Sequence, residues 1–304
     1  MKHAASALRL AITGGTGFVG NRTIAHALEA GHHVTALTRR DQPSRDGVTW
    51  IVGALDDSRA LDRLVANADA VIHVAGVVNA DRAGFIAGNI EGTRAIIDAA
   101  ARAGVKRFTH VSSLAAREPS LSTYGWSKAE AEKIVEASTL DWTILRPAAV
   151  YGPGDMEMRD LFRAAKLGIA LLPPPGIMSA VAVDDLARLL VATAERSQPR
   201  TLYEVDDGTS WTHAEFARAI GVAVGQRVMP LHLPRALMMI GARLDLMIRG
   251  DKAKLTPDRV GYLTHPDWTA FPDRRVPAKL WSPKIDLHEG LAETARWYRA
   301  HGLL

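Results

Sequence analysis

Two side chains able to transfer a proton stand one helical turn apart. Tyr124 and Lys128 are four residues apart within residues 124–138, whose pattern is typical of a helix, so both project from one face. A cation beside a phenol favours the phenolate and lowers the tyrosine pKa from its usual value of about 10. The spacing therefore predicts a tyrosine that acts as a general acid or base near neutral pH.

A glycine-rich turn near the amino terminus indicates a ligand that carries phosphate. In residues 8–20, LRLAITGGTGFVG, an apolar strand pattern leads into the spaced glycines Gly14, Gly17 and Gly20 and then into a helical pattern. Glycine permits a tight turn and close approach of the backbone to pyrophosphate, and the helix N-terminus offers N–H donors. A purely structural turn is the alternative, but strand, glycine turn and helix together favour dinucleotide binding. The candidate cofactor contacts in the turn are Gly14, Thr16, Gly17, Phe18, Val19 and Gly20.

Strand and helix patterns alternate through the first half of the chain. Strands are predicted at 8–13, 33–38, 48–52, 70–74, 107–112 and 142–146, and helices at 18–30, 58–66, 89–103 and 124–138. This alternation is typical of an α/β fold with a doubly wound parallel sheet, the Rossmann fold. This alternation of strand and helix patterns ends after Pro147. We therefore predict a dinucleotide-binding domain over 1–152, to which 181–205 returns, and a smaller substrate-facing lobe formed by 153–180 and 206–304.

Bulk composition restricts the class of protein. The 304 residues include no cysteine, which excludes disulfides and thiolate nucleophiles and fits a reducing compartment, so we expect a cytoplasmic protein. We see no signal-peptide pattern and no apolar run near the roughly 20 residues that span a bilayer. The net charge of +4 comes from scattered Lys and Arg, which predicts no nucleic-acid partner. No His, Asp and Glu cluster has metal-ligand spacing, so we predict no metal.

Several motifs follow one another in a familiar order. They are TGGTGFVG (13–20), DAVIHVAG (69–76), NIEGT (89–93), VSS (111–113), YGWSK (124–128), LRPAAVYGPGD (145–155) and EGLAETARWYRAHG (289–302). This series resembles the extended branch of the short-chain dehydrogenase/reductase superfamily, the NAD(P)-dependent epimerase/dehydratase family. The resemblance covers nearly the whole chain.

The resemblance implies a role for each residue of a catalytic set. Ser113, with Ser112 as the neighbouring alternative, would hydrogen-bond the substrate oxygen, and Tyr124 would transfer the proton. Lys128 would tune Tyr124 and bind the nicotinamide ribose. Asn89 is either a helix cap or a link in the active-site hydrogen-bond network.

The end of the second predicted strand bears on the choice of cofactor. NAD-selective members of the family carry an acidic residue there, whereas this chain has Thr38 followed by Arg39 and Arg40. An arginine can hold a 2′-phosphate through charge-assisted hydrogen bonds, so we predict NADP(H) in preference to NAD(H). The alternative is that both arginines are ordinary solvated charges. The resemblance adds four further cofactor contacts, which are Leu55, Ala75, Gly76 and Pro147.

Two departures from the family pattern limit the function. Ser113 and Tyr124 are only 11 residues apart, about half the usual gap, and Leu114 and Ala115 stand where dehydratases carry acids. We expect an NADP(H)-dependent oxidoreductase that interconverts a carbonyl and a secondary alcohol. The alternatives are a nucleotide-sugar epimerase with a tightly held cofactor, and a non-catalytic NADP(H)-binding sensor or protein similar to an accessory subunit of complex I. A homodimer is a further implication of the resemblance.

A methionine-rich apolar segment, residues 235–248, lies in the predicted smaller lobe. We expect it to be a helix in the core of that lobe. The alternatives are an apolar wall that faces the substrate, since methionine adapts to varied shapes, and peripheral contact with a membrane. An apolar wall would favour a hydrophobic small-molecule substrate.

Overall fold

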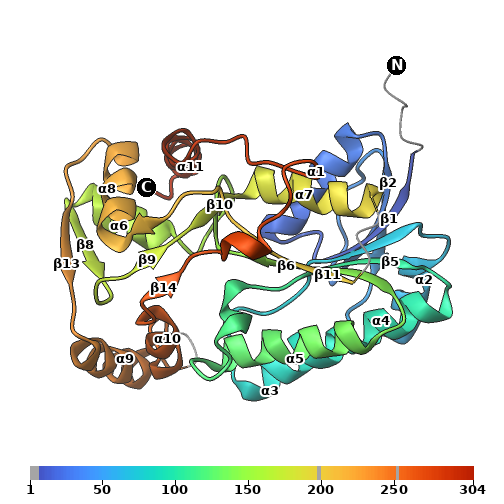
Figure 1. Cartoon of the computed structure of the whole chain (residues 1–304), viewed down its shortest axis with the longest axis horizontal. Coiled ribbons are helices and arrows are strands. Elements are labelled where there is room, and N and C mark those ends of the chain that lie inside the picture. Colours follow the sequence, from blue (N-terminus) through green and yellow to red (C-terminus); the bar gives the residue numbers. More distant parts are fainter. Residues whose placement is uncertain (1–6, 197–199, 251–252) are drawn as a thin grey trace.

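A seven-stranded parallel sheet forms the centre of the molecule (Figure 1). The structure is a computed structural model and describes residues 7–196, 200–250 and 253–304. The strands lie in the order β11-β6-β5-β4-β1-β2-β3. Their bounds are β1 (Arg9–Thr13), β2 (His33–Thr38), β3 (Val48–Val52), β4 (Ala70–His73), β5 (Arg107–Val111), β6 (Asp141–Pro147) and β11 (Thr201–Val205). The direction of winding reverses between β1 and β4, and such a point opens a crevice at the carboxyl ends of the strands.

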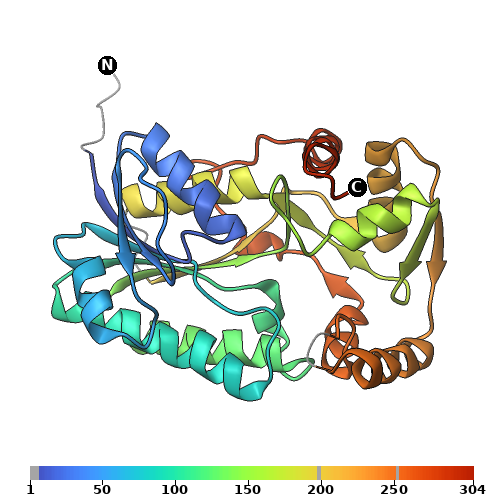
Figure 2. The ribbon, with the colours of Figure 1, turned by 180° about the vertical axis from the view of Figure 1, so that it is seen from behind.

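Helices cover both faces of this sheet, as Figures 1 and 2 show. One face carries α1 (Phe18–Glu29) and α7 (Val183–Glu195), and the other carries α2 (Ser58–Val65), α4 (Gly92–Arg102) and α5 (Thr123–Ala137). Successive residues of β1 point to opposite faces of the sheet. Ile12 packs in the cluster with α1 and α7, whereas Ala11 packs with α2 and α4. The predicted doubly wound fold is confirmed.

Local side chains fix where the helices begin. The Asp57 carboxylate accepts the Ala60 amide hydrogen at 3.0 Å and caps α2. The Ser122 hydroxyl accepts the Gly125 amide hydrogen at 3.0 Å and caps α5, so Tyr124 stands in the first turn of that helix.

Most of the remaining described elements form three small sheets and several helices, which extend from the central sheet toward one end of the molecule (Figure 1). The helices are α6 (Arg159–Lys166), α8 (His213–Val224), α9 (Arg235–Arg249), α10 (Pro257–Leu263), α11 (Leu287–Ala300) and the short η4 (Pro272–Arg274). The strands pair as β7 (Ala149–Tyr151) with β10 (Ala180–Ala182), β8 (Ile169–Leu172) with β13 (Met229–His232), and β9 (Ile177–Met178) with β12 (Trp211–Thr212) and β14 (Asp267–Trp268). The proposed division into two domains stays a prediction.

The methionine-rich helix differs from its prediction. Within α9 only Met238 and Ala242 are buried, so the helix lies at the surface and not in the core of a lobe. Its inner face packs on Val260 of α10, and its outer face is exposed. In the described part of the chain, no helix combines the length and the apolar character that crossing a membrane requires.

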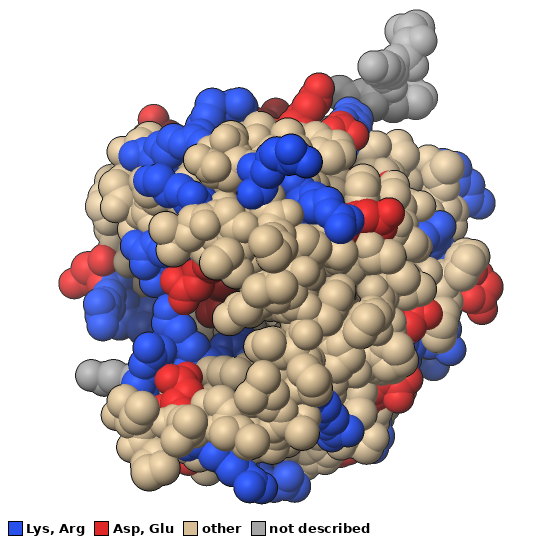
Figure 3. Space-filling view, turned by 90° about the vertical axis from the view of Figure 1, so that its left-hand side faces the viewer, with Lys and Arg blue, Asp and Glu red and all other residues tan. Residues whose placement is uncertain are grey.

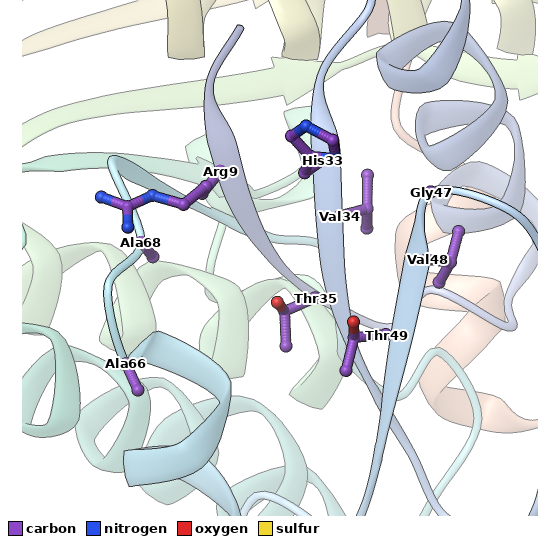
Figure 4. A pocket seen from close by; sticks show the side chains of 9 residues that line it. All are labelled: Arg9, His33, Val34, Thr35, Gly47, Val48, Thr49, Ala66 and Ala68. Carbon is purple, nitrogen blue, oxygen red and sulfur yellow. The ribbon is translucent and has the colours of Figure 1, made fainter.

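A hollow of about 360 Å³ lies at the amino ends of β1, β2 and β3. Figure 4 shows Arg9 and His33 at its rim, with Ala66 and Ala68 from the end of α2 closing one side. In a parallel sheet this edge is opposite the carboxyl ends, where ligands of doubly wound folds bind. The hollow is therefore remote from the glycine turn.

Candidate active site

The turn after β1 has no room for side chains at two of its glycines. A Cβ on Gly14, whose φ is +72°, would lie 2.7 Å from the Ala75 nitrogen, and one on Gly20 would lie 2.0 Å from the Gly14 oxygen. Gly17 precedes α1 and offers no capping side chain, so the first amide hydrogens of the helix remain available to a ligand. Thr16 is exposed in the same turn. The turn fits the pyrophosphate of a dinucleotide.

A cavity of about 660 Å³ opens beside this turn. Phe18 and Val19 from the start of α1 contribute to one wall, and Pro147 from the end of β6 contributes to another. The predicted residues Ser113, Tyr124, Lys128 and Gly76 line the same cavity. An apolar wall is formed by Val77, Val78, Phe85, Tyr262 and Leu263. The structure thus places three of the four predicted catalytic residues and part of the predicted cofactor contacts around one space.

Ser113 and Tyr124 meet despite the short segment between them. Both line the same cavity, and their side chains lie close enough for Ser113 to lower the pKa of Tyr124. Ser113 begins a 3-10 helix, η2 (Leu114–Arg117), which shortens the path from β5 to α5. At Gly125 a Cβ would lie 2.6 Å from the Ala115 oxygen, so the glycine lets α5 approach η2 closely. A gap of 11 residues is sufficient because the segment is compact.

The prediction that Lys128 lowers the pKa of Tyr124 is wrong. Burial raises the pKa of Tyr124 to about 12, while the hydrogen bond to Ser113 opposes that rise. The Lys128 ammonium donates a hydrogen bond to the Val111 carbonyl at 2.8 Å. Burial lowers the pKa of Lys128 to about 8, and the carboxylate of Glu132 opposes that fall. Tyr124 is therefore a neutral phenol at physiological pH, suited to donate a proton.

Asn89 takes part in a buried network and is not a helix cap. It lies inside a π-helical turn, η1 (Ile86–Glu91), which follows the short helix α3 (Arg82–Phe85). Its side chain accepts the Val77 amide hydrogen at 2.7 Å, donates to the Val77 carbonyl at 3.1 Å and donates to the Ser127 hydroxyl at 2.9 Å. π-Helical turns often occur at functional sites, because the extra residue redirects a side chain. Here the turn joins α5 to the segment after β4.

The residues predicted to surround the adenosine end occupy the carboxyl edge of the sheet. Arg39 and Arg40 follow β2 and are both exposed. Within residues 7–196, 200–250 and 253–304, neither guanidinium has a hydrogen-bond or ion-pair partner. Leu55 packs against Gly92 at the start of α4, and the Ala75 amide donates to the Thr13 hydroxyl at 3.2 Å.

Sequence reasoning missed a buried ion-pair network behind the catalytic residues. Arg146 donates to both oxygens of Glu132, at 2.9 and 2.6 Å, and Ser112 donates to the same carboxylate. Glu204 lies 3.6 Å from Arg146 and 3.3 Å from Arg117, which reaches the β14 segment. Glu132 is one turn beyond Lys128 on the same helix. This spacing of four residues is the sequence signal that could have placed Glu132 near the site.

One carboxyl group in the cavity is strongly perturbed. Burial raises the pKa of Asp155 to about 6, although its carboxylate accepts backbone hydrogen bonds from Glu157 and Met158. Asp155 lies in the loop after β7. The structure buries it in the cavity wall. In the described ranges, no three His, Cys, Asp or Glu residues gather as a metal site would require.

Comparisons with known proteins place the chain in a family. A family model described as NAD(P)H-binding matches residues 14–196. The ceramide reductase of Caulobacter vibrioides (strain NA1000 / CB15N) is 37% identical, over 97% of this chain and 96% of that protein. The dTDP-glucose 4,6-dehydratase of Streptomyces antibioticus is 26% identical, over 96% of this chain and 92% of that protein.

A solved structure shares the fold at lower identity. MoeE5 in complex with UDP-glucose and NAD superposes with a TM-score of 0.75 at 21% identity, covering 97% of this chain and 99% of MoeE5. The predicted resemblance is confirmed, and so is the expectation of an enzyme of this type. The chain belongs to the NAD(P)-binding epimerase, dehydratase and reductase family, the extended branch of the short-chain dehydrogenases/reductases.

Proposed function

We propose that this protein is an NADP(H)-dependent reductase that converts a ketone on a long-chain, ceramide-like lipid into a secondary alcohol. The observation that carries the proposal is the placement of Ser113 and Tyr124 together in a cavity with an apolar wall. A protein that only binds nucleotide has no need of such a pair. This favours an enzyme over the sensor alternative.

The direction of proton transfer follows from the state of Tyr124. A reduced nicotinamide supplies a hydride to the carbonyl carbon when the cofactor is bound. The carbonyl double bond becomes a single bond, and the oxygen takes the phenol proton of Tyr124, whose pKa of about 12 keeps the proton available. Ser113 holds the substrate oxygen in place, and Lys128 sits one turn beyond Tyr124 on the same helix.

The proposed preference for NADP(H) depends on Arg39 and Arg40. Both side chains are exposed at the end of β2, and among the described residues neither has a hydrogen-bond or ion-pair partner that would compete for a phosphate. The preceding Thr38 carries no charge, and its hydroxyl donates to the Arg40 carbonyl at 2.7 Å. A 2′-phosphate would therefore meet two cations, Arg39 and Arg40, directly after this strand.

The charges of the cavity favour a lipid over a nucleotide sugar. Its two arginines already have partners, because Arg82 lies 3.9 Å above the ring of Trp126 and Arg259 pairs with Glu157 at 2.9 Å. The diphosphate of a nucleotide sugar, bound in addition to the cofactor, would need cations without partners. An alkyl chain needs only the apolar wall. The similarity to a ceramide reductase across nearly the whole chain supports the same class of substrate. A homodimer and a cytoplasmic location stay predictions.

The test is NADPH consumption with a long-chain keto-ceramide in detergent micelles, with UDP-glucose as the competing substrate. Tyr124→Phe should lower kcat by about 10²- to 10⁴-fold, because the proton donor is lost. Arg39→Ala should weaken NADPH binding by about tenfold or more and leave NADH binding unchanged, and the exposed Arg218→Ala is its matched control. Turnover of UDP-glucose without any activity on the lipid ketone would contradict the proposal.

A further inference from the structure

The molecule carries an exposed apolar surface that the proposed reaction does not use. We propose that it docks the protein on an anionic lipid bilayer, with α9 lying in the interfacial plane. This apolar patch is formed by Leu237, Ile240, Leu244, Met247 and Ile248 of α9, together with Ile169, Leu171, Met229 and Leu231 of β8 and β13.

The helical part of the patch is one continuous stripe. Its residues follow the spacing i, i+3, i+7, i+10 and i+11, which covers one side of a helix. Met247 and Ile248 are 76% and 79% exposed, whereas Met238 and Ala242, on the opposite side, are buried against α10. The helix therefore has two apolar sides, and the protein covers only one. An amphipathic helix of this kind binds in the headgroup region of a membrane.

The two-stranded ribbon extends the same surface. Ile169 pairs with Met229, and Leu171 pairs with Leu231, so the alternation of the strands turns four apolar side chains to one exposed face. The other face is buried through Ala170 and Leu172. β13 leads directly into α9, and both lie at the same end of the molecule in Figures 1 and 2.

The charges around the patch suit an anionic surface. Between residues 216 and 249 the chain carries five arginines and one acidic residue, Asp245, which pairs with Arg249 at 3.2 Å. Arg227 precedes the ribbon, while Arg235 and Arg243 lie on α9, and all three are exposed. Figure 3 shows this end of the molecule, where a broad area without charged side chains has Lys and Arg above and below it and Asp and Glu at several points of its border. Basic residues near a membrane surface attract anionic lipids, and a second copy of this chain would bring the same positive charge.

The patch is also one helix away from the cavity. α10 packs on α9 through Val260, and Tyr262 and Leu263 of α10 form part of the apolar cavity wall. A bilayer at α9 would thus lie beside the element that lines the cavity. The docking surface goes beyond the proposed reaction and does not depend on it.

Vesicle binding tests the docking surface without any substrate. The full chain is sedimented with vesicles of phosphatidylcholine alone and of phosphatidylcholine with phosphatidylglycerol. We expect binding to the anionic vesicles, and at least about tenfold weaker binding by the double variant Leu244→Gln/Ile248→Gln. Val52→Gln is the matched control, because Val52 is an exposed apolar residue at the end of β3, outside the patch.

The outcomes separate the membrane from other occupants. NADPH binding by the double variant shows that it is folded, and the single variant Met247→Gln provides a milder change at an exposed position. Loss of anionic-vesicle binding in the patch variants, with binding retained by Val52→Gln, supports the proposal. Equal binding by all variants, or no binding by the wild type, overturns it. A wild-type dimer that the patch variants dissociate, without vesicle binding, assigns the patch to a second copy and also overturns it.

Discussion

Replacing Glu132 by Gln should show how much the buried ion pairs behind the site contribute to the free energy of unfolding. The Glu132 side chain is 5% exposed and receives two hydrogen bonds from Arg146 and one from Ser112. Glutamine keeps the shape and one acceptor oxygen but removes the charge. Arg146 then depends on Glu204, which lies 3.6 Å away. The variant leaves a buried guanidinium with a weaker partner.

The expected cost follows from these contacts. Breaking a buried ion pair by removing one partner costs about 3–5 kcal/mol. The amide oxygen and Glu204 compensate in part, so we expect the free energy of unfolding to fall by about 2–3 kcal/mol. Loss of the carboxylate should also lower the pKa of Lys128 further below its value of about 8, since Glu132 now opposes that fall.

The same helix offers a matched control. Glu130→Gln removes a carboxylate that pairs with Lys133 at 2.7 Å, where the lysine side chain is 67% exposed. Exposed pairs contribute little, so this variant should lose about 0.5 kcal/mol or less. Urea unfolding of both variants measures the difference. Equal losses for Glu132→Gln and Glu130→Gln would refute the view that the buried pair stabilises the site.

Three further predictions concern single positions. Gly20→Ala should abolish NADPH binding in calorimetry, because its Cβ would lie 2.0 Å from the Gly14 oxygen, and retained affinity would contradict the close packing of the turn. Burial lowers the pKa of Lys128 from 10.5 to about 8, so the unfolded chain binds more protons between these values and the free energy of unfolding should rise with pH across this window. Lys128→Met should remove that rise in urea unfolding at about pH 8 and about pH 10, and an identical rise in both proteins would argue against a buried ammonium. Gly225→Ala should cost about 1 kcal/mol, because Gly225 ends α8 with a φ of +80°, and NADPH affinity should not change.

The sequence predicted the central elements well because their signals are local. The strand 48–52 and the return strand at β11 carry clear apolar patterns, and the glycine turn has a spacing with one common structural meaning. The meeting of Ser113 with Tyr124 was predicted through the family pattern, although the chain between them is short. Their catalytic roles stay a proposal.

Properties that depend on burial in the tertiary structure could not be predicted from local sequence patterns. The spacing of Tyr124 and Lys128 predicted a lowered phenol pKa, but the surrounding fold buries the phenol and raises its pKa. The apolar pattern of α9 predicted a core helix, because periodicity records apolar positions and not which neighbour covers them. The π-helical turn that directs Asn89 has no pattern distinct from an ordinary helix.

The short segment between Ser113 and Tyr124 bears on the substrate class that we propose. The compact path through η2 brings the two hydroxyls together, so this departure from the family leaves the proton-transfer pair intact. The same departure removes chain that would otherwise be available to line the cavity, and α10 contributes Tyr262 and Leu263 to its wall. α10 in turn supports the inner side of α9. If the proposed reaction is correct, the wall that selects a lipid and the helix proposed to meet the membrane are therefore parts of one packed unit.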